Sequence, residues 1–179
     1  MKPHVALLRA VNVGGQVLPM ARLRDFVDAV GFSDVKTLLQ SGNVVFRGAK
    51  GSTGAVEQLL ESEARKRLRL DTAFMVRTAA EWESIVGRNP FRAEATTDPS
   101  HLLVLFTKDS VDAERMAALE AVIVGRERVK GDGRSVYIVY PDGIGRSRLT
   151  GALIEKKLGT RGTARNWNTV LKLQALLSA

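Results

Sequence analysis

The chain contains no cysteine, which excludes disulfide bonds, thiolate catalysis and every zinc site built on cysteine. Histidine is scarce as well: His4 and His101 are the only two, and neither lies in an HxxxH or HExxH pattern with metal-ligand spacing. No hydrophobic run is long enough to cross a membrane, because the run from Val5 to Val13 is interrupted by Arg9 and Asn12. We therefore expect a cytoplasmic protein with no metal, no cofactor and no membrane partner.

Positive charge is what the chain has in excess, and the excess is uneven. Its 27 Lys and Arg residues face 19 Asp and Glu residues, giving a net charge of +8. Between residues 126 and 179 the corresponding numbers are 11 and 4. A basic C-terminal third is typical of a surface that contacts phosphate or other anions, and a solvated basic surface kept for solubility has the same composition.

Apolar spacing in the first half predicts the order βαββαβ. Pro19 suits the first turn of a helix and Gly31 suits its end. The expected strands cover residues 4–11, 35–40, 44–47 and 73–77, and the expected helices cover residues 19–30 and 53–69. The second of these helices should bury Val56, Leu59, Leu60, Ala64 and Leu68.

The second half begins the same pattern again. His101-Leu102-Leu103-Val104-Leu105 resembles His4-Val5-Ala6-Leu7-Leu8, which opens the first half. We expect strands at 102–107, 126–130 and 135–140, and helices at 79–87, 111–122, 147–158 and 166–177. The predicted fold class is α+β, with two ferredoxin-like units in tandem at residues 1–78 and 79–179, or one compact domain. In the second unit a helix is expected in place of the last strand, with extra C-terminal helices.

Two polar clusters are expected at one end of the first sheet. In an antiparallel βαββ unit, the loop after the first strand and the turn after the second strand lie at the same end. This places Asn12, Gly14 and Gly15 beside Ser41, Gly42 and Asn43. Their backbone N–H groups could form an anion-binding concavity, while the alternatives are a hairpin that needs left-handed angles and a plain flexible connection.

Arg9 lies within the first expected strand, on the same face as Val5, Leu7 and Val11. A buried guanidinium needs a partner, so we expect Arg9 to face either a ligand anion or a carboxylate of the second half.

A third cluster opens the last expected helix. Asn166 or Thr163 is the expected N-cap, and Arg165, Asn168 and Thr169 should share one side of this helix, where the helix dipole favours an anion. Trp167 should instead be a core residue. Arg146, Arg148, Lys156, Lys157 and Arg161 add positive charge upstream.

These motifs resemble a family of bacterial proteins, domain of unknown function 1697. The resemblance runs over nearly the whole chain. Its pieces are Ala6-Leu7-Leu8-Arg9-Ala10-Val11-Asn12-Val13-Gly14-Gly15, Pro19-Met20 with Leu23, Gln40-Ser41-Gly42-Asn43-Val44-Val45-Phe46, Asn89-Pro90-Phe91, and Thr163 with Arg165-Asn166-Trp167-Asn168-Thr169-Val170. The resemblance implies an α+β fold of paired ferredoxin-like units and supplies no activity.

Three function classes remain open on the sequence. The favoured hypothesis is a noncatalytic module that binds nucleic acid or a nucleotide-like phosphate ligand through Arg9, Asn12, Gly14, Gly15, Ser41, Gly42, Asn43, Arg165, Asn166, Asn168 and Thr169. A hydrolase or transferase acting on a phosphorylated metabolite is the first alternative, and a protein-interaction or structural role is the second. The expected strands carry Leu, Val and Ala rather than aromatics, which argues against base stacking on the sheet. The pattern does not indicate an oligomeric state.

Overall fold

The structure is a computed structural model that describes residues 1–11 and 17–179. The chain forms two compact units. The first contains Met1–Ser84 together with Lys172–Ala179, and the second contains Ile85–Leu171.

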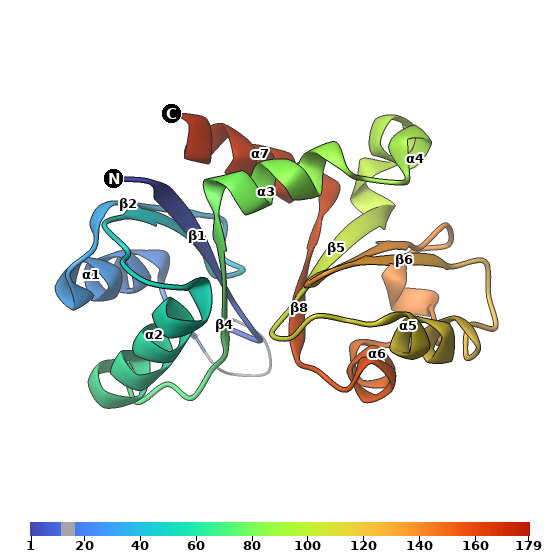
Figure 1. The fold of residues 1–179 in the computed structure, drawn as a ribbon, viewed down its shortest axis with the longest axis horizontal. Helices are drawn as coiled ribbons and strands as arrows, with labels where there is room; N and C mark the ends of the chain where they lie inside the picture. The colour runs from blue at the N-terminus through green and yellow to red at the C-terminus, as the bar shows by residue number, and fades with distance from the viewer. Residues whose placement is uncertain (12–16) are drawn as a thin grey trace. The chain divides into compact units, whose positions relative to one another are not determined.

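The first unit follows the predicted βαββαβ order (Figure 1). Its elements are β1 (Pro3–Leu8), α1 (Met20–Val30), β2 (Ser33–Leu38), β3 (Asn43–Arg47), α2 (Thr53–Leu68) and β4 (Phe74–Thr78), followed by α3 (Ala79–Gly87). The sheet order is β2-β3-β1-β4, and every neighbouring pair is antiparallel. The central strand β1 therefore ends between the start of β3 and the start of β4.

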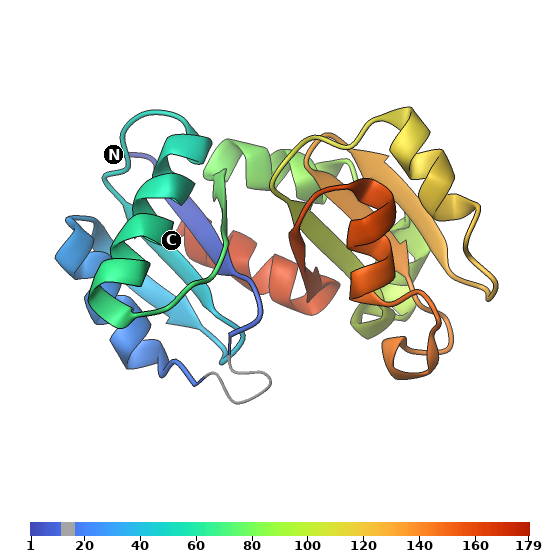
Figure 2. The ribbon, with the colours of Figure 1, turned by 90° about the horizontal axis from the view of Figure 1, so that it is seen from below.

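Helices α1 and α2 cover one face of this sheet (Figure 2) and form the core of the unit with it. Leu60 and Ala64 of α2 are buried there, as predicted. Leu59 was predicted to be buried and is 44% exposed, whereas the neighbouring face of α2 buries Glu57. Because the helix turns by about 100° per residue, Leu59 lies off the stripe that contains Val56, Leu60 and Ala64.

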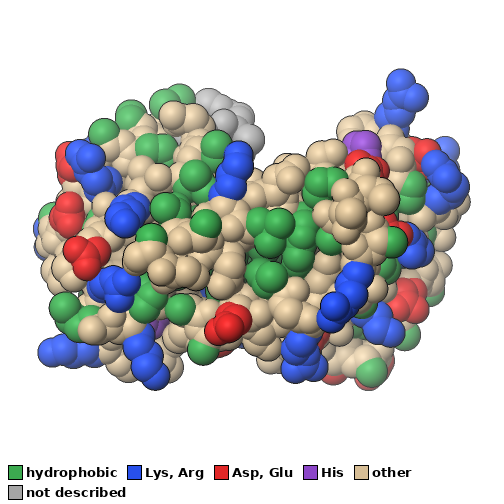
Figure 3. Space-filling model, turned by 90° about the horizontal axis from the view of Figure 1, so that it is seen from above, with side chains coloured by type: hydrophobic (Ala, Val, Ile, Leu, Met, Phe, Trp, Pro, Cys, Tyr) green, Lys and Arg blue, Asp and Glu red, His purple; other side chains and the backbone are tan. Residues whose placement is uncertain are grey.

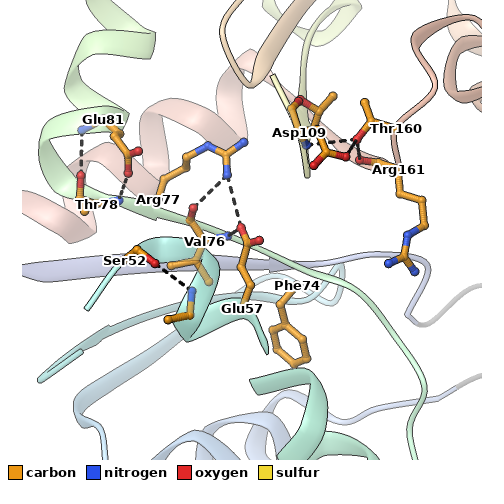
Figure 4. A network of polar contacts seen from close by, with 12 residues as sticks. Ser52, Glu57, Phe74, Val76, Arg77, Thr78, Glu81, Asp109, Thr160 and Arg161 are labelled. Atoms are coloured by element: carbon orange, nitrogen blue, oxygen red, sulfur yellow. Dashed lines mark hydrogen bonds and ion pairs between the residues drawn. The ribbon is translucent and has the colours of Figure 1, made fainter. Parts of the chain in front are cut away.

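The burial of Glu57 has a structural cause, which Figure 4 shows. Glu57 Oε1 accepts a hydrogen bond from Val76 N–H at 2.8 Å. One turn later in α2, Glu61 Oε1 accepts a hydrogen bond from Phe74 N–H at 2.9 Å. Both N–H groups lie on the side of β4 that faces away from β1. Two carboxylates one helical turn apart thus accept hydrogen bonds from the N–H groups at the outer edge of β4. An edge strand with unpaired N–H groups can otherwise pair with another chain.

The second unit repeats this arrangement. After α4 (Arg92–Thr97) and a 3₁₀ turn (Pro99–His101) come β5 (Leu102–Thr107), α5 (Ala113–Glu120), β6 (Arg128–Asp132), β7 (Ser135–Val139), a 3₁₀ turn (Ile144–Arg146), α6 (Gly151–Leu158), β8 (Gly162–Asn166) and α7 (Trp167–Ser178). The sheet order is β6-β7-β5-β8, again antiparallel throughout. The predicted α+β class with tandem units is confirmed.

The prediction that a helix replaces the last strand of the second unit is wrong. Strand β8 pairs with β5, with Leu105 opposite Ala164 and Val104 opposite Arg165. Its sequence, Gly-Thr-Ala-Arg-Asn, has no apolar alternation, so the periodicity gave no strand signal. The pairing with β5, which is a tertiary interaction, makes it a strand.

Hydrogen bonds at matching positions show how closely the units correspond. Leu8 N–H donates to Gly42 O at 2.9 Å, and Thr107 N–H donates to Arg134 O at 3.0 Å. Each bond joins the last residue of the central strand to the residue just before the third strand. A glutamate also accepts a hydrogen bond from the first residue of the fourth strand in both units. Glu155 Oε1 accepts from Gly162 N–H at 3.1 Å, as Glu61 Oε1 does from Phe74 N–H. We call this contact between a helix glutamate and the fourth strand the clamp.

None of the helices in the described parts of the chain combines the length and apolar character that a bilayer crossing requires.

Candidate functional site

The Ser41–Asn43 turn lies against the end of β1, as the topology predicts. At Gly42, with φ of +79°, an added Cβ would stand 2.9 Å from Leu8 Cβ and 2.6 Å from Val11 Cγ2. The fully buried Asn43 donates from Nδ2 to Leu38 O at 2.7 Å and to Ser41 Oγ at 2.9 Å. These amide contacts hold the hairpin closed, which gives Asn43 an architectural role.

Asn12, Gly14 and Gly15 lie outside the described residues. Val11, the last described residue before them, is buried at Gly42. The predicted nest at residues 12–15 therefore stays a prediction.

Arg9 does not lie within the first strand, which corrects the expectation. Strand β1 ends at Leu8, and Ala10 adopts a left-handed φ of 54°. Arg9 is half-buried just beyond the strand, where its N–H donates to Ala73 O at 3.0 Å and its carbonyl accepts from the Thr72 hydroxyl. The left-handed conformation of Ala10 turns the chain out of the sheet. The apolar alternation of the sequence continues to Val11, which is why the strand was predicted to be longer than it is.

Arg165 lies in β8 and not in the last helix, so the predicted helical face of Arg165, Asn168 and Thr169 is wrong. The guanidinium is buried, and its Nη1 donates to Thr163 Oγ1 at 2.7 Å and to Ala164 O at 2.8 Å. Burial lowers the pKa of Arg165 to about 10, which leaves it protonated at neutral pH.

Asn166 is the N-cap of α7, one of the two predicted alternatives. Its Oδ1 accepts a hydrogen bond from Thr169 N–H at 3.0 Å. Thr169 is buried, Asn168 is exposed, and Trp167 is buried as predicted.

The predicted site residues thus fall into two groups. Arg9, Ser41, Gly42 and Asn43 belong to the first unit, while the cluster at 165–169 belongs to the second. A pocket common to the two groups remains a prediction.

Sequence reasoning named Arg161 as a source of positive charge but missed that the fold brings it to one end of the second sheet together with two other basic residues. Lys108 follows the end of β5, Arg134 precedes β7, and Arg161 precedes β8. Because β7, β5 and β8 are neighbours in this order, the three residues lie along three adjacent strand ends. We call Lys108, Arg134 and Arg161 the basic row.

Main-chain hydrogen bonds hold the basic row together. Lys108 N–H donates to Arg161 O at 2.9 Å, and the preceding Thr107 N–H donates to Arg134 O at 3.0 Å. Arg161 is exposed, whereas Lys108 and Arg134 are half-buried. The sequence signal was incomplete because Arg161 adjoins a strand that the periodicity did not reveal.

Asp109 and Thr160 brace the row from the side (Figure 4). Thr160 Oγ1 donates to Asp109 Oδ2 at 3.0 Å and accepts from Asp109 N–H at 3.1 Å. The one carboxylate that immediately follows Lys108 is therefore engaged by a hydroxyl, which fixes the loop after β5 against the loop before β8.

At the three matching positions, the first unit carries one basic residue. The residues that occupy the positions of Lys108, Arg134 and Arg161 are Arg9, Gly42 and Ala73, as their equivalent hydrogen bonds show. The two units share a backbone arrangement but differ in charge here.

Candidates for catalysis and metal binding are few among the described residues. His4 is buried and stacked on Phe46, and burial lowers its pKa. His101 Nδ1 lies 2.8 Å from Asp98 Oδ2 on a 3₁₀ turn. Within the described ranges, no group of three or more histidine and acidic side chains has the arrangement of a metal site.

Basic side chains on one face of the molecule are dispersed. On the face drawn in Figure 3, lysine and arginine side chains stand among neutral ones and do not merge into one continuous patch. Several form surface ion pairs with neighbours, such as Arg24 with Asp25 and Arg65 with Asp71. The basic row differs because its members come from three separate elements.

Comparison with known proteins identifies the family. The conserved bacterial protein SP0830 from Streptococcus pneumoniae has a similar structure, with a TM-score of 0.78 at 20% sequence identity over 100% of this chain and 99% of that one. This likeness shows the fold alone. A comparison with curated proteins gives no match. The model of the family DUF1697, described as protein of unknown function, matches residues 1–137. The chain therefore belongs to the DUF1697 family.

Proposed function

We propose that this protein is a noncatalytic binding module for phosphate-bearing ligands, either nucleic acid or a nucleotide-like molecule, and that the basic row of the second unit is its binding site. The observation that supports the proposal is that three adjacent strand ends each carry a cation, where the equivalent ends of the first unit carry one.

Electrostatics supports this assignment. Cations gathered at one end of a sheet raise the local positive potential, and such a potential attracts phosphate and speeds its association. Arginine and lysine are also the side chains that most often contact phosphate oxygens. The Asp109 carboxylate, which follows Lys108 in the sequence, accepts a hydrogen bond from the Thr160 hydroxyl. This bond holds the loop that contains Lys108 next to the loop that contains Arg161.

Binding of a fluorescein-labelled DNA duplex at increasing salt tests the proposal. We expect the affinity of the intact protein to fall by orders of magnitude between about 50 and 200 mM salt if several phosphates are neutralised. In the variant Lys108→Ala/Arg134→Ala/Arg161→Ala, we expect the slope of log affinity against log salt to decrease by roughly 0.9 for each lost phosphate contact.

A charge-matched variant controls for nonspecific attraction. Arg24→Ala/Arg65→Ala/Arg67→Ala also removes three cations, all of them exposed in helices of the first unit. This variant should retain the slope of the intact protein. Equal losses in both variants would reject the basic row as the site, and no binding of DNA, nucleotides or tripolyphosphate at low salt would reject the proposed function.

A further inference from the structure

We propose that the outer edge of β6 binds an extended acidic segment of a partner protein, which adds to the four-stranded second sheet as a further strand. This surface and this class of ligand go beyond the proposed function and do not depend on it. Three observations carry the proposal: the outward-facing backbone groups of β6, the cation at the centre of this strand, and the groove between β6 and α5.

The register of the second sheet shows which backbone groups face β6. Thr107 N–H donates to Arg134 O at 3.0 Å. This bond marks the neighbouring pair of Phe106 and Ser135 as one that exchanges no hydrogen bonds. The N–H and C=O of Ser135 therefore face β6, where Asp132 lies opposite and is hydrogen-bonded to it.

The outward-facing residues of β6 follow from Asp132, because backbone direction alternates along a strand. Like Asp132, Lys130 directs its N–H and C=O towards β7, whereas Val129 and Gly131 direct theirs towards the outer edge. In the described part of the chain, no hydrogen bond engages these outward groups of Val129 and Gly131. Strand β6 thus presents two donors and two acceptors to an added strand.

The other sheet edges are closed or irregular. In β4, three glutamates accept hydrogen bonds from the outward N–H groups of Phe74, Val76 and Thr78. In β8, Glu155 accepts one from Gly162 N–H, and the register of β2 with β3 shifts partway along the strand. Such features prevent an edge from pairing with another chain. Among the edges that the structure describes, β6 combines a regular register with backbone groups that no side chain engages.

Lys130 determines which kind of strand can add here. It is exposed, lies between the two outward-facing residues, and makes no ion pair with any described residue. A second copy of β6 that paired Val129 with Gly131 would place Lys130 directly opposite the same lysine of that copy. Like charges in this position are destabilising, and an edge lysine commonly prevents self-pairing. The charge therefore favours a partner segment with an acidic residue opposite Lys130.

A groove between β6 and α5 provides space for apolar side chains. Helix α5 lies beside β6 (Figure 1), and the groove between them has a volume of about 340 Å³. Its lining residues are Val111, Asp112, Ala113, Met116, Ala117, Glu120, Lys130 and Gly131. Residues that pair with Val129 and Gly131 share their face of the sheet, where Val129 packs with Met116. The segment is therefore an extended apolar–acidic–apolar triplet, with both apolar side chains on the α5 side.

Fluorescence polarisation with labelled peptides tests this pattern. The probes are Ser-Thr-Val-Glu-Val-Thr-Ser and its relatives with alanine, leucine, isoleucine or phenylalanine in place of both valines. We expect at least one of them to bind with a dissociation constant below about 1 mM. Replacing its glutamate by lysine should weaken binding at least about fivefold. Absence of binding by the whole set, or equal binding of the glutamate and lysine forms, would overturn the proposal.

Methylation of peptide nitrogens distinguishes strand addition from adsorption by charge. In the added strand, the N–H groups of the two apolar residues face β6 and that of the glutamate faces away. Methylating both apolar residues should weaken binding at least about tenfold, whereas methylating the glutamate should change it by no more than about twofold. Equal effects at the two kinds of position contradict strand addition.

Variants of the protein locate the site. Lys130→Glu should reverse the preference, so that the lysine peptide binds better than the glutamate peptide, while Arg24→Glu, the same change at an exposed position of α1, should keep it. Ala117→Leu should fill the groove and weaken binding. Ala118→Leu is the control, because Ala118 is exposed on the same helix and does not line the groove. An unchanged preference in Lys130→Glu, or equal effects of the two leucine variants, places the peptide elsewhere and rejects this surface.

The remaining measurements separate this surface from the basic row and from self-association. The variant Lys108→Ala/Arg134→Ala/Arg161→Ala should bind the peptide as the intact protein does, whatever happens to its DNA binding. Loss of peptide binding in this variant would assign the peptide to the basic row and overturn the proposal. Hydrogen exchange at Val129 and Gly131 should slow when the peptide is added. Slowing that instead follows protein concentration without peptide would show a second copy on this edge and reject the acidic partner.

Discussion

Gly42 is the residue at which backbone conformation and packing constrain the chain together. Its φ is +79°, and Leu8 and Val11 fill the space that a side chain would need. The Asn43 amide then closes the same turn from within. Substitutions in this turn thus act first on the fold, and any effect on binding has to be measured against that.

We expect Gly42→Ala to destabilise the protein by about 2–5 kcal/mol. Left-handed backbone costs a non-glycine residue about 1–2 kcal/mol, and overpacking adds about 1–3 kcal/mol. Gly51→Ala is a matched control: its φ is +85°, but an added Cβ would meet only Ala55 Cβ at 3.8 Å. Urea unfolding should show a loss of only about 1–2 kcal/mol for the control, and equal losses in the two variants would contradict the packing argument.

Tyr137 and Tyr140 should make the protein less stable in alkali. Burial, with a contribution from Asp132, raises the pKa of Tyr137 to about 12, and burial, with a contribution from Glu127, raises the pKa of Tyr140 to about 12. A raised folded-state pKa means that the unfolded state loses its protons first. The contribution of the two tyrosines to the free energy of unfolding is complete below pH 10 and is lost as the pH rises towards 12.

Urea unfolding at pH 9, 10 and 11 measures this effect. The loss in the free energy of unfolding approaches about 3 kcal/mol per tyrosine between pH 10 and pH 12, and part of it should be seen by pH 11. The variant Tyr137→Phe/Tyr140→Phe should be less stable at pH 9, because it lacks two hydroxyl hydrogen bonds, and should show a flatter dependence on pH. An unchanged pH dependence in this variant would assign the effect to other groups.

At the scale of elements, helix α2 does more than cover the sheet. Its Glu57 and Glu61 supply the acceptors that β4 lacks at its outer edge. Glu57 also lies 3.7 Å from the buried Arg77 guanidinium. The apolar stripe of α2 was predictable from the sequence, but the role of Glu57 was not, because a glutamate on a helix is normally solvated and only the neighbouring strand edge explains its burial.

Glu57→Ala should destabilise the protein by about 3 kcal/mol, because removing one partner of a buried ion pair leaves charge and N–H groups poorly compensated. Glu63→Ala makes the same change six residues later in α2, where the carboxylate pairs with Lys66 and Arg67 at the surface. That control should cost no more than about 1 kcal/mol in thermal or urea unfolding. A loss for Glu57→Ala as small as that for the control would show that the clamp on β4 is dispensable.

Strand β8 shows the limit of predicting elements from periodicity. Strand β5 was predicted at its observed bounds because its apolar residues are continuous, whereas β8 exists through pairing with β5. The basic row depends on that missed strand, so its residues were visible in the sequence as charges but not as neighbours. The predicted Arg165 cluster was placed on the wrong element for the same reason.

At the scale of the molecule, the repeated His-Val-Ala-Leu-Leu and His-Leu-Leu-Val-Leu segments correctly predicted two tandem units. The return of Lys172–Ala179 to the first unit was not predicted. Periodicity shows which face of a helix is apolar, but it contains no information about the unit against which that face packs. Leu173 and Leu177 are buried, and Leu176 lines a pocket of about 240 Å³ together with Val45 of β3.

Removing residues 172–179 should therefore loosen the first unit although the deletion lies at the far end of the chain. Hydrogen exchange should accelerate in β1 and β3, with β5 and β7 much less affected. The milder variant Leu173→Ala/Leu177→Ala should act in the same direction, at about 2–5 kcal/mol for each buried leucine. Faster exchange confined to the second unit would contradict this assignment.

The fourth strand of each unit passes directly into a helix: β4 ends at Thr78 and α3 begins at Ala79, while β8 ends at Asn166 and α7 begins at Trp167. With no connecting residue to absorb a change in length, one inserted residue rotates everything downstream by about 100° about the helix axis. Trp82 and Val170, both fully buried, would turn away from their contacts. The number of residues in each of these strands thus determines which face of the following helix is turned towards the core. The two junctions should therefore tolerate substitutions far better than insertions or deletions.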